Sequence, residues 1–115
     1  MNVKHAAEKI GISTHTIRYY DKSGLFPFIA RDAHGNRNFS ETDLYWIEFV
    51  KCMRQTHMPI VQIKKIAELY EQGPSTKQSR IEILKSHQQN LIAQSALIDD
   101  ALTILDDKFA LIENE

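Results

Sequence analysis

Side chains able to bind nucleic acid gather in one short segment near the start of this sequence. They are His15, Thr16, Arg18, Tyr19 and Tyr20. Arg and Tyr can hold phosphate oxygens, while Thr and His can reach the edges of bases. A helix with a purely structural role would not need an Arg-Tyr-Tyr run beside hydroxyl-bearing residues. The segment therefore predicts a DNA-reading surface, with His15 and Thr16 close to the base edges.

Cys52 is the one residue whose type suggests reactivity. Adjacent Lys51 and nearby Arg54 are cations, which favour the thiolate form. The alternative is that Cys52 is a small hydrophobic residue packed in an apolar helix. A single cysteine excludes an intrachain disulfide, so sensing would require adduct formation or an event between subunits.

Two short helices are expected to position the DNA-reading residues. Residues 3–10 form an amphipathic run, Gly11 supplies a turn, and residues 13–21 form the second helix with Ser13 as its N-cap. This arrangement is a helix-turn-helix, whose second helix enters the major groove. Either tyrosine could belong to the core, and we expect one to pack partly inward while its hydroxyl reaches phosphate.

A β-hairpin is expected next, because the runs Phe28-Ile29-Ala30 and Asn38-Phe39 flank a turn at residues 34–36. Arg31 and Arg37 would then meet the sugar-phosphate backbone or the minor groove, as in a wing. The alternative is a solvated hairpin with two incidental arginines. Arg54, near the end of the next helix, is a further expected DNA contact.

Three helices should follow this hairpin: one from Ser40 to about Gln55, one from Pro59 to Gly73, and one from Ser75 to about Ile112. The last carries a heptad stripe of apolar residues. Its members are Ile81, Leu84, Leu91, Ile98, Leu102, Leu105, Phe109 and Ile112. A helix of about 55 Å, at 1.5 Å per residue, cannot bury this stripe on so small a domain, so a second copy should cover it. The alternative is a helix folded back on its own domain.

Charge and composition narrow the function further. Residues 1–40 carry six Lys and Arg against three acids, whereas residues 73–115 carry four against seven. The basic end is thus the predicted DNA reader. No His pairs with another ligand at helical spacing, and no phosphate loop or nucleophile elbow occurs, so we expect no metal, no cofactor, no catalytic residue and no enzyme activity. The absence of a signal peptide or a long apolar run predicts a cytoplasmic protein without a membrane partner.

The run TIRYYDKSGLFP at residues 16–27, together with residues 31–39, resembles the signature of the MerR family of bacterial transcriptional regulators. The resemblance implies a fold that is all-α with a small β-hairpin wing. A winged helix-turn-helix would occupy residues 1–72, and a dimerisation helix in an antiparallel coiled coil would occupy 75–112. It also implies a homodimer that distorts promoter DNA to align the contacts of RNA polymerase.

The place of Cys52 resembles the thiol-based branch of that family, which responds to aldehydes, other electrophiles or nitrosative stress. Metal-responsive and drug-responsive members fit poorly, because the sequence has one Cys and only three residues beyond Ile112. Two alternatives stay open. One is an effector-independent DNA-bending protein of the excisionase type, and the other is a coiled-coil protein whose N-terminal domain binds protein.

Overall fold

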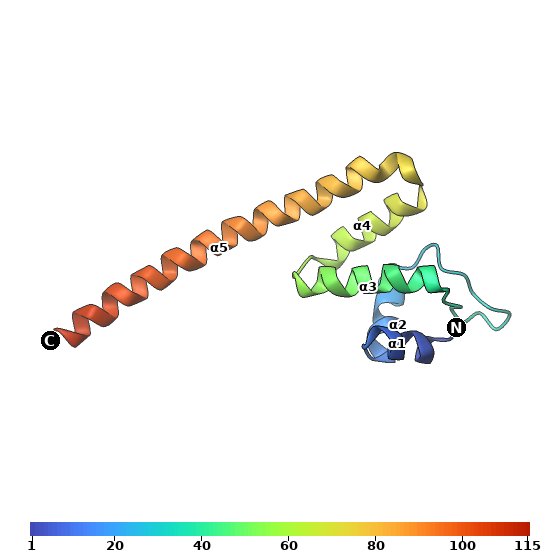
Figure 1. Cartoon of the computed structure of the whole chain (residues 1–115), viewed down its shortest axis with the longest axis horizontal. Coiled ribbons are helices and arrows are strands. Elements are labelled where there is room, and N and C mark those ends of the chain that lie inside the picture. Colours follow the sequence, from blue (N-terminus) through green and yellow to red (C-terminus); the bar gives the residue numbers. More distant parts are fainter. The chain divides into compact units, whose positions relative to one another are not determined.

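The computed structural model describes residues 1–115, and its regular elements are helices, without a strand (Figure 1). Its helices are α1 (Val3–Ile10), α2 (Thr14–Lys22), α3 (Glu41–Gln55), α4 (Ile60–Glu71) and α5 (Lys77–Glu113), with a short 3-10 turn, η1 (Pro74–Thr76), before α5. The chain divides into two compact units, Met1–Arg80 and Ile81–Glu115. The predicted helical class and the long C-terminal helix are confirmed.

Short polar residues begin the first three helices. Asn2 accepts a hydrogen bond from the backbone of His5 at 2.9 Å, and the Ser13 hydroxyl accepts one from the backbone of Thr16 at 3.0 Å. Between α1 and α2, Gly11 adopts φ +79°, where a side chain would be strained. At α3, Ser40 and Asp43 form a reciprocal capping box. These caps fix the residue at which each of the three helices starts.

The core of the first unit lies between the helix-turn-helix and the faces of α3 and α4. Its buried apolar residues include Ala6, Ala7, Ile17, Leu25, Phe26, Ile29, Phe39, Ile47, Val50, Met58, Ile63 and Ile66. Phe26 and Phe39 meet edge to face with ring centroids 6.0 Å apart, a favourable aromatic geometry. The Trp46 indole donates to the Leu25 carbonyl at 2.8 Å, so α3 also holds the turn that follows α2.

The first turn of α5 belongs to the first unit. The Thr76 hydroxyl donates to the Leu69 carbonyl at 2.6 Å and accepts from the Arg80 guanidinium at 3.1 Å. That guanidinium also lies 5.4 Å from the ring centroid of Tyr70, within the range of a cation–π contact. These contacts join α4, η1 and the start of α5.

The predicted β-hairpin wing is not seen. In its place, residues 28–39 form a loop, here called the wing loop, with a single antiparallel bridge between Arg31 and Arg37. The Asp32 carboxylate accepts from the backbone N–H groups of His34 at 2.9 Å and Asn36 at 3.0 Å. A side chain that binds local N–H groups in this way competes with a strand ladder, which explains the loop.

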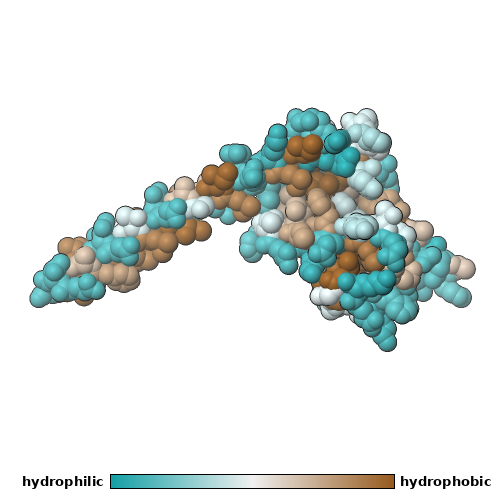
Figure 2. Space-filling model, viewed as in Figure 1, coloured by the Kyte–Doolittle hydropathy of each residue, from teal (hydrophilic) through white to brown (hydrophobic).

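Helix α5 presents its apolar residues to solvent, since none of its residues is buried. Ile98 is 60% exposed, Leu105 51% and Ile112 66%, which is unusual for side chains of this kind. Figure 2 shows apolar residues along much of the visible side of this helix. No helix of the chain has both the length and the apolar character needed to span a membrane.

Candidate nucleic-acid interface

The outward face of α2 carries most of the predicted DNA-reading residues. His15 and Arg18 are exposed, and Tyr19 keeps 48% of its surface open to solvent. Thr16 is half-buried, and its hydroxyl shares a 2.8 Å hydrogen bond with Ser13. On the opposite face Ile17 is buried. The helix therefore separates a core side from a polar side, as a recognition helix requires.

Tyr20 is the tyrosine that packs inward, with 6% of its surface exposed. Burial raises the pKa of its hydroxyl, while the nearby positive charge of Arg54 acts in the opposite direction. Arg54 itself is half-buried and donates to the Met58 carbonyl at 2.7 Å. This hydrogen bond spans the turn between α3 and α4, and it holds the Arg54 guanidinium near Tyr20 of α2.

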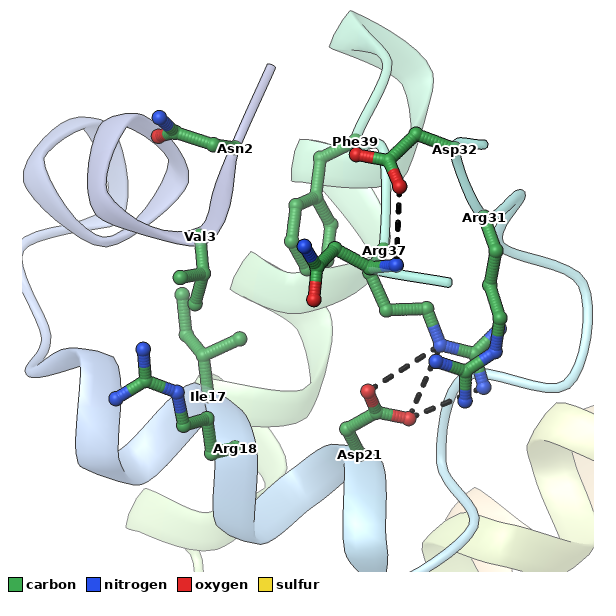
Figure 3. Close-up of a pocket in the computed structure, with 10 residues that line it drawn as sticks. Asn2, Val3, Ile17, Arg18, Asp21, Arg31, Asp32, Arg37 and Phe39 are labelled. Atoms are coloured by element: carbon green, nitrogen blue, oxygen red, sulfur yellow. Dashed lines mark hydrogen bonds and ion pairs between the residues drawn. The ribbon is translucent and has the colours of Figure 1, made fainter. Parts of the chain in front are cut away.

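A cavity of about 320 Å³ lies between α2, the start of α1 and the wing loop (Figure 3). Its lining residues are Asn2, Val3, Ile17, Arg18, Asp21, Arg31, Asp32, Asn36, Arg37 and Phe39. Three of these are arginines from two different segments, so the cavity brings together Arg18 of the helix and both arginines of the wing loop. Phosphate binding in protein–DNA complexes relies on such groups.

The three arginines of the cavity have different surroundings. Arg37 donates through Nε to both carboxylate oxygens of Asp21, at 3.1 and 3.2 Å, and through Nη1 to the Ile29 carbonyl. Arg31 donates to the Gly35 carbonyl at 2.7 Å, within the wing loop. Arg18 has no hydrogen bond or ion pair within the chain. Arg18 is thus the arginine of the cavity with a free guanidinium.

Cys52 lies away from this cavity, half-buried on α3. Its thiol is 3.8 Å from a carboxylate oxygen of Glu48. Lys51 instead donates to the Ile10 carbonyl at 3.1 Å, and Arg54 is bound to Met58. The polar group in contact with the thiol is thus an acid, and Lys51 and Arg54 both bind other groups. The structure does not support the prediction that these two cations surround the thiol.

Sequence reasoning missed Asp21, which lines the arginine-rich cavity and binds Arg37 there. The available indication was an acidic residue directly after Arg-Tyr-Tyr, in the most basic part of the chain. No group of three potential ligands that could hold a metal ion occurs. His15 is the one His of α2 and lies on its outward face.

Comparison with known proteins gives one consistent result. The sequence profile of the family described as MerR HTH family regulatory protein matches residues 1–69. An uncharacterised HTH-type transcriptional regulator of Haemophilus influenzae is 39% identical over 108 residues, which are 94% of this chain and 80% of that protein. The HTH-type transcriptional regulator AdhR of Bacillus subtilis is 37% identical over 92 residues, covering 80% of this chain and 66% of AdhR.

Solved structures agree with these sequence relatives. HiNmlR, described as a MerR family regulator lacking the sensor domain and bound to promoter DNA, superposes with a TM-score of 0.72 at 37% identity, over 98% of this chain and 90% of that one. A MerR family transcriptional regulator from Bacillus thuringiensis superposes with a TM-score of 0.73 at 32% identity, over 96% of both chains.

Proposed function

Since this chain belongs to the MerR family of helix-turn-helix regulatory proteins, we propose that it acts as a homodimer on promoter DNA. DNA binding and regulation of transcription are the activities of the family, and its members named above are not enzymes. The proposed partner is double-stranded DNA, in the bacterial cytoplasm. The proposed action is a distortion of the promoter that realigns the contacts of RNA polymerase.

The observation that carries this proposal is the outward face of α2 next to the arginine-lined cavity. Arg18 offers a free guanidinium and Tyr19 an exposed phenol, both suited to phosphate oxygens. His15 and Thr16 lie nearer the N-terminus of the helix, where a recognition helix meets base edges. HiNmlR, a similar chain, has been solved on promoter DNA. Tyr20, Arg31 and Arg54 complete the proposed interface, and Arg37 lines the same cavity from the wing loop.

A gel shift on a promoter-sized duplex at several salt concentrations tests DNA binding. Affinity should fall steeply and linearly on a log–log plot, because phosphate contacts release counterions. A chain that shows no salt-dependent binding to duplex is not a DNA-binding regulator. Transcription from promoters of altered spacer length then separates a MerR-type regulator from an excisionase-type bending protein. Only the regulator should require a particular spacer.

Dimerisation through α5 is proposed from its exposed apolar stripe. The side chains at Leu102, Leu105 and Phe109 are each more than half exposed in the single chain. A continuous helix of 37 residues that buries none of them needs a partner, and a second copy of the same heptad pattern supplies one. Resemblance to the family favours an antiparallel pair, which would present two DNA-binding units to the two halves of a pseudo-palindrome.

A response to electrophiles through Cys52 is the most specific part of the proposed function. It rests on the place of Cys52 in α3, which resembles the thiol-based branch of the family, while the Glu48 carboxylate beside the thiol argues for low reactivity. A bulky adduct on this half-buried side chain would disturb close packing around α3, where one extra methylene is felt.

Intact-mass analysis and transcription assays of wild type and Cys52→Ser, each with and without a small aldehyde such as propionaldehyde, test this response. We expect an adduct and altered transcription in wild type only, with DNA affinity within a small factor in every sample. If altered transcription persists in Cys52→Ser, the cysteine is structural and the effector acts elsewhere.

A further inference from the structure

We propose that Arg37 is a positioning residue, which holds the wing loop against α2 through Asp21 and so determines where Arg31 meets the DNA backbone. This inference rests on the proposed function, because the loop matters only if the cavity faces DNA. It assigns Arg37 a different task from Arg18 and Arg31, although all three line the same cavity.

Each nitrogen of the Arg37 guanidinium has a partner inside the chain. Its Nε lies 3.1 and 3.2 Å from the two carboxylate oxygens of Asp21, its Nη2 lies 3.1 Å from one of them, and its Nη1 donates to the Ile29 carbonyl. The side chains of Arg37 and Asp21 are only 17% and 24% exposed. The Nε–Nη2 edge, which is the edge that can bind a phosphate in bidentate fashion, is already occupied by the Asp21 carboxylate.

The wing loop needs such an attachment because it lacks a strand ladder. Arg31 and Arg37 form its single bridge, between backbone hydrogen bonds that join Asp32 to Asn36 and Asn38 to Ala30. The two arginines therefore face each other as a non-hydrogen-bonded pair, in which side chains come closest and like charges repel. Asp21, from α2, binds the Arg37 guanidinium and so offsets this repulsion, as the contacts between the two side chains in Figure 3 show.

The attachment leaves two cations available on opposite sides of the cavity. Arg18 stands on α2 without an internal partner, and Arg31 uses one guanidinium nitrogen on the Gly35 carbonyl. A loop free to swing would present Arg31 at many distances from Arg18. A loop fixed by Asp21 and Arg37 holds Arg31 at a single distance from Arg18. This lowers the entropic cost of binding two phosphates at once.

Amide hydrogen exchange tests the attachment without DNA. Asp21→Asn keeps the size of the side chain but removes the charge that binds Arg37. We expect faster exchange of the Asp32 and Asn38 amides, which are bonded within the wing loop, and unchanged exchange in the middle of α3. Unchanged exchange in the wing loop would overturn the inference. Arg37→Lys is the second variant, since lysine keeps the charge without the bidentate fork, and it should give an intermediate acceleration.

A double-mutant cycle on random-sequence duplex tests the consequence for DNA. In wild type, Arg31→Ala should lower the log–log salt slope of binding by about one unit. In the Asp21→Asn background the same change should have almost no effect, whereas Arg18→Ala should lower the slope equally in both backgrounds. Equal effects of Arg31→Ala in the two backgrounds would mean that Asp21 and Arg37 do not act through Arg31. Absence of any binding by wild type would instead refute the proposed function, and the exchange result would still decide the attachment.

Discussion

Arg18 and Arg37 carry the same charge at one cavity, yet their contacts predict different consequences of mutation. Arg18 has no internal partner, so Arg18→Ala should leave the free energy of unfolding nearly unchanged. Its loss should reduce affinity for specific and random duplex alike and lower the log–log salt slope by about one unit, measured by fluorescence anisotropy. Lys77→Ala removes a charge from an exposed residue outside the cavity and is the matched control. A slope that falls equally in both variants would remove Arg18 from the interface.

Tyr20 should make stability depend on pH in the alkaline range. Its pKa in the folded chain is raised by burial above the ordinary value of about 10. As pH rises, the hydroxyl therefore loses its proton in the unfolded chain before it does in the folded chain. The free energy of unfolding is unaffected by ionisation of Tyr20 below the ordinary pKa and falls as pH rises from there toward the raised pKa of the folded chain. Tyr20→Phe should lose less stability than wild type between about pH 9 and about pH 11, by urea unfolding. Tyr45→Phe, at a residue 79% exposed, should behave like wild type.

Single-residue roles were predictable from the sequence where they depend on neighbours along the chain. Ser13 as a cap follows from its place directly before the second helix, and it is confirmed. The partners of Asp21 and Lys51 could not be predicted. Asp21 binds a residue 16 positions away, and Lys51 binds a carbonyl 41 positions away. Such choices depend on distances that exist only after the helices have packed.

Among the elements, α3 allows a direct test of the capping argument. Ser40→Ala removes the hydroxyl that accepts from the Asp43 backbone at 3.1 Å and leaves that N–H without its cap. The free energy of unfolding should fall by about 1 kcal/mol, measured by urea denaturation. Ser86→Ala, at an exposed site within α5, should have little effect or stabilise slightly. Equal values for the two variants would show that the cap contributes nothing.

The boundaries of the helices were easier to predict than the wing. Capping residues and prolines act locally, so the end of α3 at Gln55 agrees with the sequence. The two runs that flank the turn at residues 34–36 suggested two strands, but the Asp32 carboxylate binds the N–H groups of His34 and Asn36. Ile29 and Phe39, near the two ends of the loop, are nevertheless buried. The residue types at 28–39 thus indicated a turn but not the hydrogen bonding around it.

At the scale of the whole molecule, the small domain and the long helix differ in how much apolar surface they bury within the single chain. The first unit has its own buried core, whereas α5 contributes no buried residue. An exposed apolar stripe of this length predicts association, because burial of apolar surface contributes roughly 25 cal/mol per Å². The heptad pattern predicted this helix and its exposed stripe from sequence. The partner that covers the stripe remains a proposal, because one chain does not contain it.

Dimerisation through α5 predicts that charge placed in the stripe will separate the protomers. Leu91→Glu combined with Ile98→Glu would place two carboxylates in the apolar stripe of each protomer, where the proposed dimer buries them. Each unpaired buried charge costs several kcal/mol. The double variant should be monomeric by light scattering and should lose binding to a pseudo-palindromic site, while its helix-turn-helix remains folded. Ser86→Glu with Ala93→Glu adds the same charge on the opposite side of the helix and should remain dimeric. A Leu91→Glu/Ile98→Glu variant that stays dimeric would show that the protomers meet on another surface.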